Sequence, residues 1–343
     1  MPEQVTVAVD ANGADKGPAE VARGAALAAA AGTRVLLFGP AADLGTGRAG
    51  SDLVEVVDAP LSIAKAADPA RAVRGNPGAS IVQAVEAVAA GRADVLVSGG
   101  STGAALAASL FSFKRARGVH RPALAVVVPV PGSPFLLLDA GANVEVRPEH
   151  LVQFAHMGAA FMEVVMGVER PRVALLSNGE EATKGPEHVV AAHAALQGHP
   201  GFVGNVEGFA IGSGVADVIV ADGFAGNVAL KVMEGTSSVL LGAVRGAATS
   251  SLRGRLGGLL LRPALRGLRD ELDPEQAGGA VLLGLRRLAV VPHGSFGARG
   301  FARAIEDAAR GVREDVVGRT HERLAAAGAL REPSAAAGTV SGP

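Results

Sequence analysis

The stretch DVLVSGGSTGAALAASLFSFKR, residues 94–115, decides the fold class. It opens with a short apolar run at Asp94–Val97 and turns through glycine and serine. It then continues as an alanine- and leucine-rich segment over Ser101–Arg115. A short apolar run, a glycine turn and a helical pattern are typical of one strand–helix unit of a sheet that is covered on both faces. The stretch therefore predicts an α/β protein.

The same alternation extends along the chain in both directions. It predicts a parallel sheet in a three-layer α/β/α, Rossmann-like sandwich. We expect residues 1–331 to form one α/β domain, 240–275 to leave it as a helical hairpin protrusion, and 332–343 to form a disordered, Pro/Gly-rich tail. The expected strands are Val5–Val9, Arg34–Phe38, Asp94–Val97, Ala123–Val130, Phe135–Asp139, Arg172–Leu176, Asp217–Val220 and Leu288–Val291. The expected helices are Pro18–Ala31, Pro77–Ala90, Ser101–Arg115, Glu149–Met166, Pro186–Leu196, Asn227–Gly242 and Ala298–Ala309.

Composition excludes several classes of protein. The 343 residues carry a formal net charge of −1, so no overall field points to nucleic acid. The chain has no cysteine, which excludes disulfides, thiolate nucleophiles and cysteine-bound metals. The N-terminus lacks the pattern of a signal peptide, and no apolar run reaches the roughly 20 residues of a membrane span. We expect a cytoplasmic protein, with peripheral contact as its only route to a membrane.

The loop VSGGSTG, at Val97–Gly103, has the composition of an anion site. Ligands of open α/β sheets bind beyond the carboxyl ends of the strands. Here the N–H groups at a helix start, from Gly100 to Gly103, and the hydroxyls of Ser101 and Thr102 suit phosphate. A plain capped turn explains the same residues equally well.

The loop LSNGEEATKG adds charge at a second strand end. Lys184 can hold a phosphate oxygen or the oxyanion of an attacked thioester. Glu180 and Glu181 can orient this lysine, bind substrate or bind Mg²⁺. A solvated acidic turn beside a surface lysine is the alternative.

Two further loops, LDAGAN and ADGFAGN, share the order Asp, Gly, Asn. Asp139 and Asp222 suit turn or helix capping as well as substrate binding. Asn143 and Asn227 favour substrate contact, because a neutral amide donates to phosphate without adding charge. The residue His293, in PHGS, can protonate a leaving thiolate, or it is a structural loop histidine.

Two basic segments suggest binding surfaces. Lys114, Arg115, Arg117 and Arg121 lie near a helix end and suit an acidic protein partner, although helix-dipole stabilisation and solvation explain them too. Aromatic residues are not interleaved with them, which disfavours nucleic acid.

The segment 245–269 combines arginines with apolar side chains, which fits a membrane interface. A hairpin packed on its own core or on a dimer mate is the alternative. Pro263 should break any single long helix here. The expected membrane-contact residues are Leu256, Leu259, Leu260 and Leu261.

Taken in order, the motifs resemble the phosphate acyltransferase (PlsX) family over roughly Val7–Ala309. The closest stretches are GANVEVRPEHLVQFAHMG, NGEEATKG, GNVEG, DGFAGNVALKVMEG and LLG…HGS. The resemblance implies a sandwich related to phosphotransacetylases and isocitrate-dehydrogenase-like enzymes, a homodimer, and a helical tip at the membrane. It implies transfer of a fatty acyl group from acyl carrier protein to inorganic phosphate, giving acyl phosphate for phospholipid synthesis. No cofactor is implied, with Mg²⁺ left open.

Matching motif positions give the expected site. The catalytic candidates are Lys184, His293 and Asn227. The substrate-binding candidates are Asp10, Gly100, Ser101, Thr102, Gly103, Asp139, Asn143, Glu180, Glu181, Asn205, Glu207 and Asp222. The sequence departs from the family motifs at Asn12, Ala14, Asn76, Ser101, Phe209, Ala210 and Ala225.

These departures keep two alternatives open. One is a non-catalytic scaffold that binds carrier protein, and the other is a transacylase with another acceptor. A hydride-transfer enzyme is not supported, because DANGAD at Asp10–Asp15 is not a G-x-G-x-x-G loop.

Overall fold

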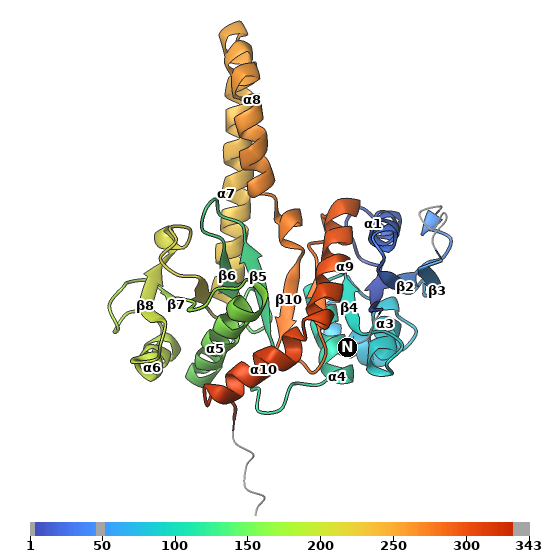
Figure 1. Ribbon diagram of the computed structural model, residues 1–343, viewed down its shortest axis with the longest axis horizontal. Coiled ribbons are helices and arrows are strands. Elements are labelled where there is room, and N and C mark those ends of the chain that lie inside the picture. Colours follow the sequence, from blue (N-terminus) through green and yellow to red (C-terminus); the bar gives the residue numbers. More distant parts are fainter. Residues whose placement is uncertain (1–3, 46–51, 332–343) are drawn as a thin grey trace, which may run out of the picture.

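The computed structural model describes residues 4–45 and 52–331 (Figure 1). The expected tail, 332–343, lies outside the described residues. Within them, one 11-stranded sheet runs in the order β3-β2-β1-β4-β11-β10-β5-β6-β9-β7-β8. Helices lie on both of its faces, so the α/β/α sandwich predicted from the sequence is confirmed.

The elements have the following bounds. The strands are β1 Thr6–Asp10, β2 Arg34–Gly39, β3 Val54–Asp58, β4 Val95–Ser98, β5 Ala123–Val128, β6 Phe135–Leu138, β7 Val173–Ser177, β8 Phe202–Glu207, β9 Val218–Val220, β10 Ala280–Leu283 and β11 Ala289–Val291. The helices are α1 Pro18–Ala30, α2 Pro69–Gly75, α3 Ser80–Ala89, α4 Thr102–Ser112, α5 Pro148–Val165, α6 Glu187–Leu196, α7 Gly223–Thr249, α8 Leu252–Glu271, α9 Ala298–Arg313 and α10 Val316–Ala326, with short 3₁₀ turns at Gly208–Ala210 and Pro274–Ala277.

The sheet is mixed, so the prediction of a parallel sheet is wrong at its centre. Strand β10 is antiparallel to both β11 and β5, and β5 is antiparallel to β6. Two hairpins cause the reversals. One turns through PVPGSP at 129–134, with Gly132 at φ +74°, and the other turns at Gly284, with φ +86°. Glycine adopts such angles without strain, and the Pro-Gly signal is typical of a turn.

The reversal does not send the strand-end loops of the two halves in opposite directions. Strands β1 to β4 and β11 are parallel to one another, and so are β6, β9, β7 and β8. Neighbouring strands in a sheet are rotated by about 20–25°. Six neighbouring-strand pairs lead from β4 to β7, and their rotations add up to roughly 120–150°. This twist offsets much of the antiparallel orientation between the two groups of strands.

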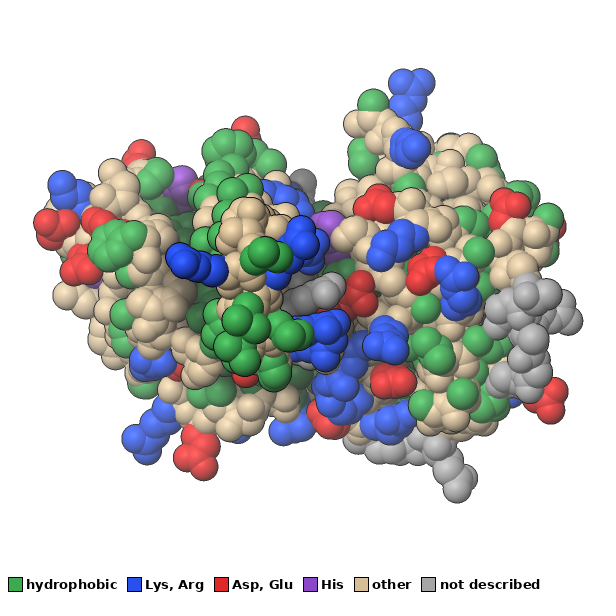
Figure 2. All heavy atoms as spheres, turned by 90° about the horizontal axis from the view of Figure 1, so that it is seen from above, with side chains coloured by type: hydrophobic (Ala, Val, Ile, Leu, Met, Phe, Trp, Pro, Cys, Tyr) green, Lys and Arg blue, Asp and Glu red, His purple; other side chains and the backbone are tan. Residues whose placement is uncertain are grey.

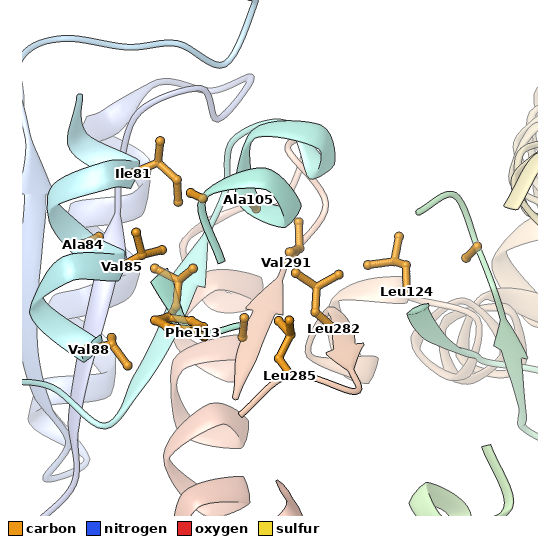
Figure 3. Packing of buried hydrophobic residues seen from close by; sticks show 14 of the residues in the cluster. Ile81, Ala84, Val85, Val88, Ala105, Phe113, Leu124, Leu282, Leu285 and Val291 are labelled. Carbon is orange, nitrogen blue, oxygen red and sulfur yellow. The ribbon is translucent and has the colours of Figure 1, made fainter. Parts of the chain in front are cut away.

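The core lies on both faces of the sheet. Val7 faces the cluster formed with α1 and α9, whereas the next residue, Ala8, faces the cluster formed with α3. Figure 3 shows Val85 of α3 packed near Phe113, and Ile81 near Ala105. Since both faces are buried, the strands have continuous apolar sequences and not alternating ones.

The predicted hairpin protrusion is formed by α7 and α8, which project together from the sandwich (Figure 1). Small residues let the helices approach, since a Cβ on Gly258 would lie 3.0 Å from the Cβ of Ala248. Pro263 lies inside α8, so the expected helix break there is wrong. An internal proline costs about 3 kcal/mol, and packing of α8 along α7 offsets it.

Candidate active site

Asp10 ends β1 and is the centre of a buried polar cluster. Its Oδ1 accepts hydrogen bonds from Ser80 Oγ (2.6 Å) and Asn12 N (3.2 Å), and its Oδ2 accepts one from Ser98 Oγ (2.9 Å). Burial raises the pKa of Asp10 to about 6, while these hydrogen bonds act to lower it. The side chain is 2% exposed, and its hydrogen bonds hold the surrounding loops. Asp10 also lines a small pocket, and its role in substrate binding stays a prediction.

Asn12 belongs to the same cluster, which explains one departure from the family motif. Its Nδ2 donates to the carbonyl of Ala59 at 3.1 Å and to Ser80 Oγ at 3.0 Å. The cluster continues to the glycine loop, because Gly100 N donates to Ser98 Oγ at 3.3 Å. A small pocket opens beside these residues.

The glycine loop at 99–103 is shaped by close packing. A Cβ on Gly99 would lie 2.7 Å from the ring of Phe301. Ser101 caps α4, accepting a hydrogen bond from Ala104 N at 3.2 Å, and its own hydroxyl hydrogen remains able to donate. Thr102 and Gly103 lie in the first turn of α4, where helix amides lack backbone acceptors and the dipole is positive. The amides of Thr102 and Gly103 are therefore available to a ligand, and anion binding at this loop stays a prediction.

Asp139 and Asn143 hold a loop and do not form an open binding site. Asp139 is fully buried and accepts five hydrogen bonds, and burial raises its pKa while these bonds act to lower it. The Nδ2 of Asn143 donates to Pro122 O and to Asp139 Oδ2, both at 2.8 Å. Both amide hydrogens are thus used, and the prediction that Asn143 donates to phosphate is corrected. The five donors to Asp139 are Leu124 N, Gly141 N, Ala142 N, Asn143 N and Asn143 Nδ2.

Asn227 lies beside this loop with a free side chain. Asp222 caps α7, accepting from Phe224 N at 2.9 Å and from Ala225 N at 2.8 Å. Gly226 lets the first turn of α7 lie against the Asp139 loop, since a Cβ at this position would be 2.0 Å from Asp139 O. Asn227 is exposed, and no hydrogen bond engages its amide within the described parts of the chain. It is therefore able to contact a substrate, as expected, whereas Asp222 acts as a helix cap.

The loop after β7 presents Lys184 to solvent. Glu180, Glu181 and Lys184 are all exposed. Across residues 4–45 and 52–331, Lys184 forms no ion pair, so the expected orientation by the two glutamates is absent. A free ammonium on an exposed loop can contact a ligand.

Asn205 supports the same loop from β8. Its Nδ2 donates to Glu181 O at 2.9 Å, and its Oδ1 lies 2.9 Å from His193 Nδ1. These two hydrogen bonds give Asn205 a structural role. Glu207, at the end of β8, is half-buried. His188 Nε2 lies 3.6 Å from Asp222 Oδ2 and joins the loop to the start of α7.

His293 follows β11 and meets α7. Its Nε2 lies 3.2 Å from the Nζ of Lys231, and its Nδ1 lies 2.7 Å from Ser295 Oγ. Lys231 Nζ also pairs with Glu234 Oε2 at 2.7 Å. Lys231 was not predicted as a site residue, because it lies inside a helix and not in a strand-end loop. Its position four residues after Asn227, on the same helix face, was the available signal.

The structure therefore arranges the expected residues in two groups. One surrounds the ends of β1, β4 and β11, and the other surrounds the ends of β6, β7, β8 and β9. Helix α7 links them, because it begins at Asp222 and contacts His293 through Lys231. Among the described residues, no cluster of three or more metal-binding side chains occurs.

The basic loop after α4 is exposed at all four predicted positions, Lys114, Arg115, Arg117 and Arg121. The guanidinium of Arg115 donates to His120 O, and no ion pair neutralises any of the four within the described chain. Arg286 Nε donates to Arg115 O at 3.1 Å and adds a cation that the sequence did not reveal.

The leucines of α8 face outward at the projecting end. Their exposed fractions are 62% for Leu256, 62% for Leu259, 75% for Leu260 and 58% for Leu261. Figure 2, which looks down on the hairpin, shows hydrophobic side chains there flanked by Lys and Arg. In the part of the chain that the structure describes, no helix is long and apolar enough to cross a membrane.

The fold has the architecture of the phosphotransacetylases. EutD phosphotransacetylase from Staphylococcus aureus matches with a TM-score of 0.58 and 18% identity, over 90% of this chain and 94% of that one. A phosphotransacetylase from Streptococcus pyogenes matches with a TM-score of 0.60 and 16% identity, over 91% and 95% of the two chains. At such identities the likeness concerns the fold alone.

Sequence similarity then identifies the family. A family model described as "Fatty acid synthesis protein" matches residues 5–319. The phosphate acyltransferase of Heliobacterium modesticaldum is 44% identical over 326 residues, covering 93% of this chain and 97% of that protein. That of Geobacillus thermodenitrificans is 42% identical over 318 residues, covering 92% and 97%. The chain belongs to the phosphate acyltransferase family and is an acyltransferase.

Proposed function

We propose that this enzyme transfers a fatty acyl group from acyl carrier protein to inorganic phosphate, giving acyl phosphate for phospholipid synthesis. The relatives named phosphate acyltransferase, at 44% and 42% identity, support phosphate as the acceptor. The observation that carries the proposal is the placement of α7 between two groups of strand-end loops. The helix start at Thr102, which is half-buried, belongs to one of the two loop groups that α7 links. The exposed amide of Asn227 belongs to the other.

The chemistry is direct acyl transfer. An oxygen of hydrogen phosphate forms a bond to the thioester carbonyl carbon, and the carbon–sulfur bond then breaks. The proton that hydrogen phosphate carried ends on the departing thiolate, so no proton is gained or lost overall. Phosphate needs positioning more than activation, because it is already an anion at neutral pH.

Separate groups serve the acceptor and the donor. The first-turn amides of α4, at Thr102 and Gly103, hold phosphate oxygens. Lys184 stabilises the oxyanion that develops on the thioester carbonyl, and Asn227 hydrogen-bonds the reacting groups. Since phosphate is the nucleophile, no covalent acyl-enzyme forms.

The basic loop docks the carrier protein. Exposed cations without acidic partners favour an acidic surface, and Lys114, Arg117 and Arg121 supply them. The loop lies beside the second group of site residues, because Pro122 accepts the hydrogen bond of Asn143.

Membrane contact and dimer formation use the hairpin. The outward leucines of α8 insert at the bilayer surface, and flanking arginines attract anionic lipid headgroups. A second copy covers the apolar side chains of α7, whose exposed fractions include 60% for Val232 and 74% for Val239. Large exposed apolar patches mark such interfaces.

No cofactor takes part in the proposed reaction. Glu180 and Glu181 are the available carboxylates if Mg²⁺ assists, in which case EDTA would abolish turnover and added Mg²⁺ would restore it.

The test is product formation by purified protein with long-chain acyl carrier protein and phosphate, trapping acyl phosphate as its hydroxamate. We expect product that depends on both substrates, with lower efficiency for acyl-CoA. Product only with another acceptor would identify a different transacylase. Carrier-protein binding without any product would indicate a scaffold.

A further inference from the structure

A lysine–histidine contact lies where α7 passes the end of β11. The Nζ of Lys231 is 3.2 Å from His293 Nε2 and 2.7 Å from Glu234 Oε2. The Lys231 side chain is half-exposed and His293 is exposed, so a ligand can reach both. The cation of this cluster is the ammonium of Lys231, and the proposed reaction assigns it no role.

The contact determines which ring nitrogen of His293 carries hydrogen. An ammonium group has three donor hydrogens and no acceptor, so Nε2 must accept the hydrogen bond from Lys231. The neutral ring then carries its hydrogen on Nδ1, facing Ser295 Oγ at 2.7 Å. Ser295 N also donates to this nitrogen at 3.3 Å, a longer contact that requires the opposite tautomer. The hydrogen bond from Lys231 outweighs it, because its donor is charged. In this arrangement His293 has no proton to give at Nε2.

The ammonium of Lys231 still has one unused donor. Glu234 and His293 take two of its three hydrogens and fix the position of Nζ. The third is free for an anion.

The choice of lysine is informative in this chain. Only five of its 32 basic residues are lysines, namely Lys16, Lys65, Lys114, Lys184 and Lys231. Arginine would present a planar fork of donors, whereas lysine presents a compact charge that fits between two acceptors. The ammonium of Lys231 lies between two such acceptors, Glu234 and His293.

We propose that Lys231 is a catalytic residue that binds the phosphate acceptor, and that His293 positions Lys231 as a neutral hydrogen-bond acceptor. The inference rests on the proposed function and reassigns His293, which the sequence suggested as a general acid. Helix α7 gives Lys231 a rigid base between the two loop groups, about 6 Å along the axis from Asn227.

The first test is phosphate binding without any acyl donor. Inorganic phosphate should raise the melting temperature of the wild-type protein and of Arg92→Gln, an exposed control on the turn before β4. It should raise that of Lys231→Gln much less, because only the amides of α4 then hold the phosphate. An equal shift in all three would overturn the role of Lys231, whether or not the enzyme makes acyl phosphate. Lys231→Ala replaces Lys231→Gln if the latter does not fold.

The second test uses turnover. Lys231→Gln should lower kcat/KM for phosphate by about 10²–10³, the usual loss for one such donor, with little change in KM for acyl carrier protein. A loss below threefold would refute the proposal. If wild-type protein makes no acyl phosphate, the proposed function fails, and the phosphate-binding result still decides Lys231.

The role of His293 is tested by rescue. Glutamine offers an oxygen acceptor to Lys231 but cannot act as a general acid. His293→Gln should therefore keep activity within about tenfold of wild type, while His293→Leu should match Lys231→Gln. Equal losses in the Gln and Leu variants would return His293 to acid catalysis and contradict the positioning role.

Discussion

Replacing Asp10 with asparagine should stabilise the protein at neutral pH and not at acid pH. Burial raises the pKa of Asp10 from 3.8 to about 6. Each pKa unit corresponds to about 1.4 kcal/mol, so ionising this carboxylate in the folded state costs about 3 kcal/mol. The folded-state pKa lies above the unfolded value. The contribution of protonated Asp10 to the free energy of unfolding is therefore complete below pH 3.8. It is lost as the pH rises to about 6.

Asparagine should fit because the cluster can reorient. Its oxygen can accept from Ser80 or from Asn12 N, and its amide can donate to Ser98 Oγ. We therefore expect Asp10→Asn and wild type to have similar free energies of unfolding near pH 4. At pH 7.5 the variant should be more stable by about 3 kcal/mol.

The assay is urea unfolding followed by far-ultraviolet circular dichroism at several pH values, since the chain has no Trp or Tyr for fluorescence. Asp43→Asn, at an exposed position after β2, is the control. A stability difference that does not change with pH would refute the reasoning. So would a wild type that gains stability over Asp10→Asn as the pH rises.

Three further predictions concern the proposed surfaces. Lys184→Ala should lower turnover about 10²–10³-fold through loss of an oxyanion donor, and near-wild-type turnover in steady-state assays would exclude that role. Reversing Lys114 and Arg117 to Glu should raise KM for acyl carrier protein about tenfold, since exposed charge pairs contribute up to about 1 kcal/mol each. It should spare acyl-CoA, and equal loss with both donors would argue against docking. The double variant Leu259→Glu and Leu260→Glu should bind anionic vesicles at least tenfold more weakly, because each leucine buried in the bilayer contributes about 1.5–3 kcal/mol. Unchanged sedimentation with vesicles would contradict membrane insertion.

Matched controls separate these effects from misfolding. Leu27, on α1, is also an exposed leucine, at 49%, and Leu27→Glu should leave vesicle binding unchanged. Arg92→Gln controls for the loss of an exposed cation.

Much of the fold could be predicted because each unit carries its own local signal. The strand, glycine turn and helix around residues 94–115 appear where expected, with α4 starting at Thr102. Strands with weaker patterns were missed, such as β8 at Phe202–Glu207, which contains two polar residues and a glycine. Strand patterns alone do not predict the mixed sheet, because strand direction depends on hairpins such as the one at Gly132.

The site was harder to predict because hydrogen-bond partners are set by tertiary contacts. Asp10 and Asn143 have the right residue types at strand ends, yet their polar atoms are used internally. Asn227 and Asn143 cannot be distinguished by sequence, since only packing decides which amide is free. Lys231 meets His293 across 62 residues of sequence, and neither local propensity nor spacing reveals that contact.

The central claim is that phosphate attacks the thioester directly. It is tested by mixing wild-type enzyme with long-chain acyl carrier protein without phosphate, and recording intact masses of both proteins before and after adding phosphate. We predict unmodified enzyme and intact acyl carrier protein at first, then free carrier protein and acyl phosphate once phosphate is present. An enzyme heavier by one acyl group before phosphate is added would contradict the account.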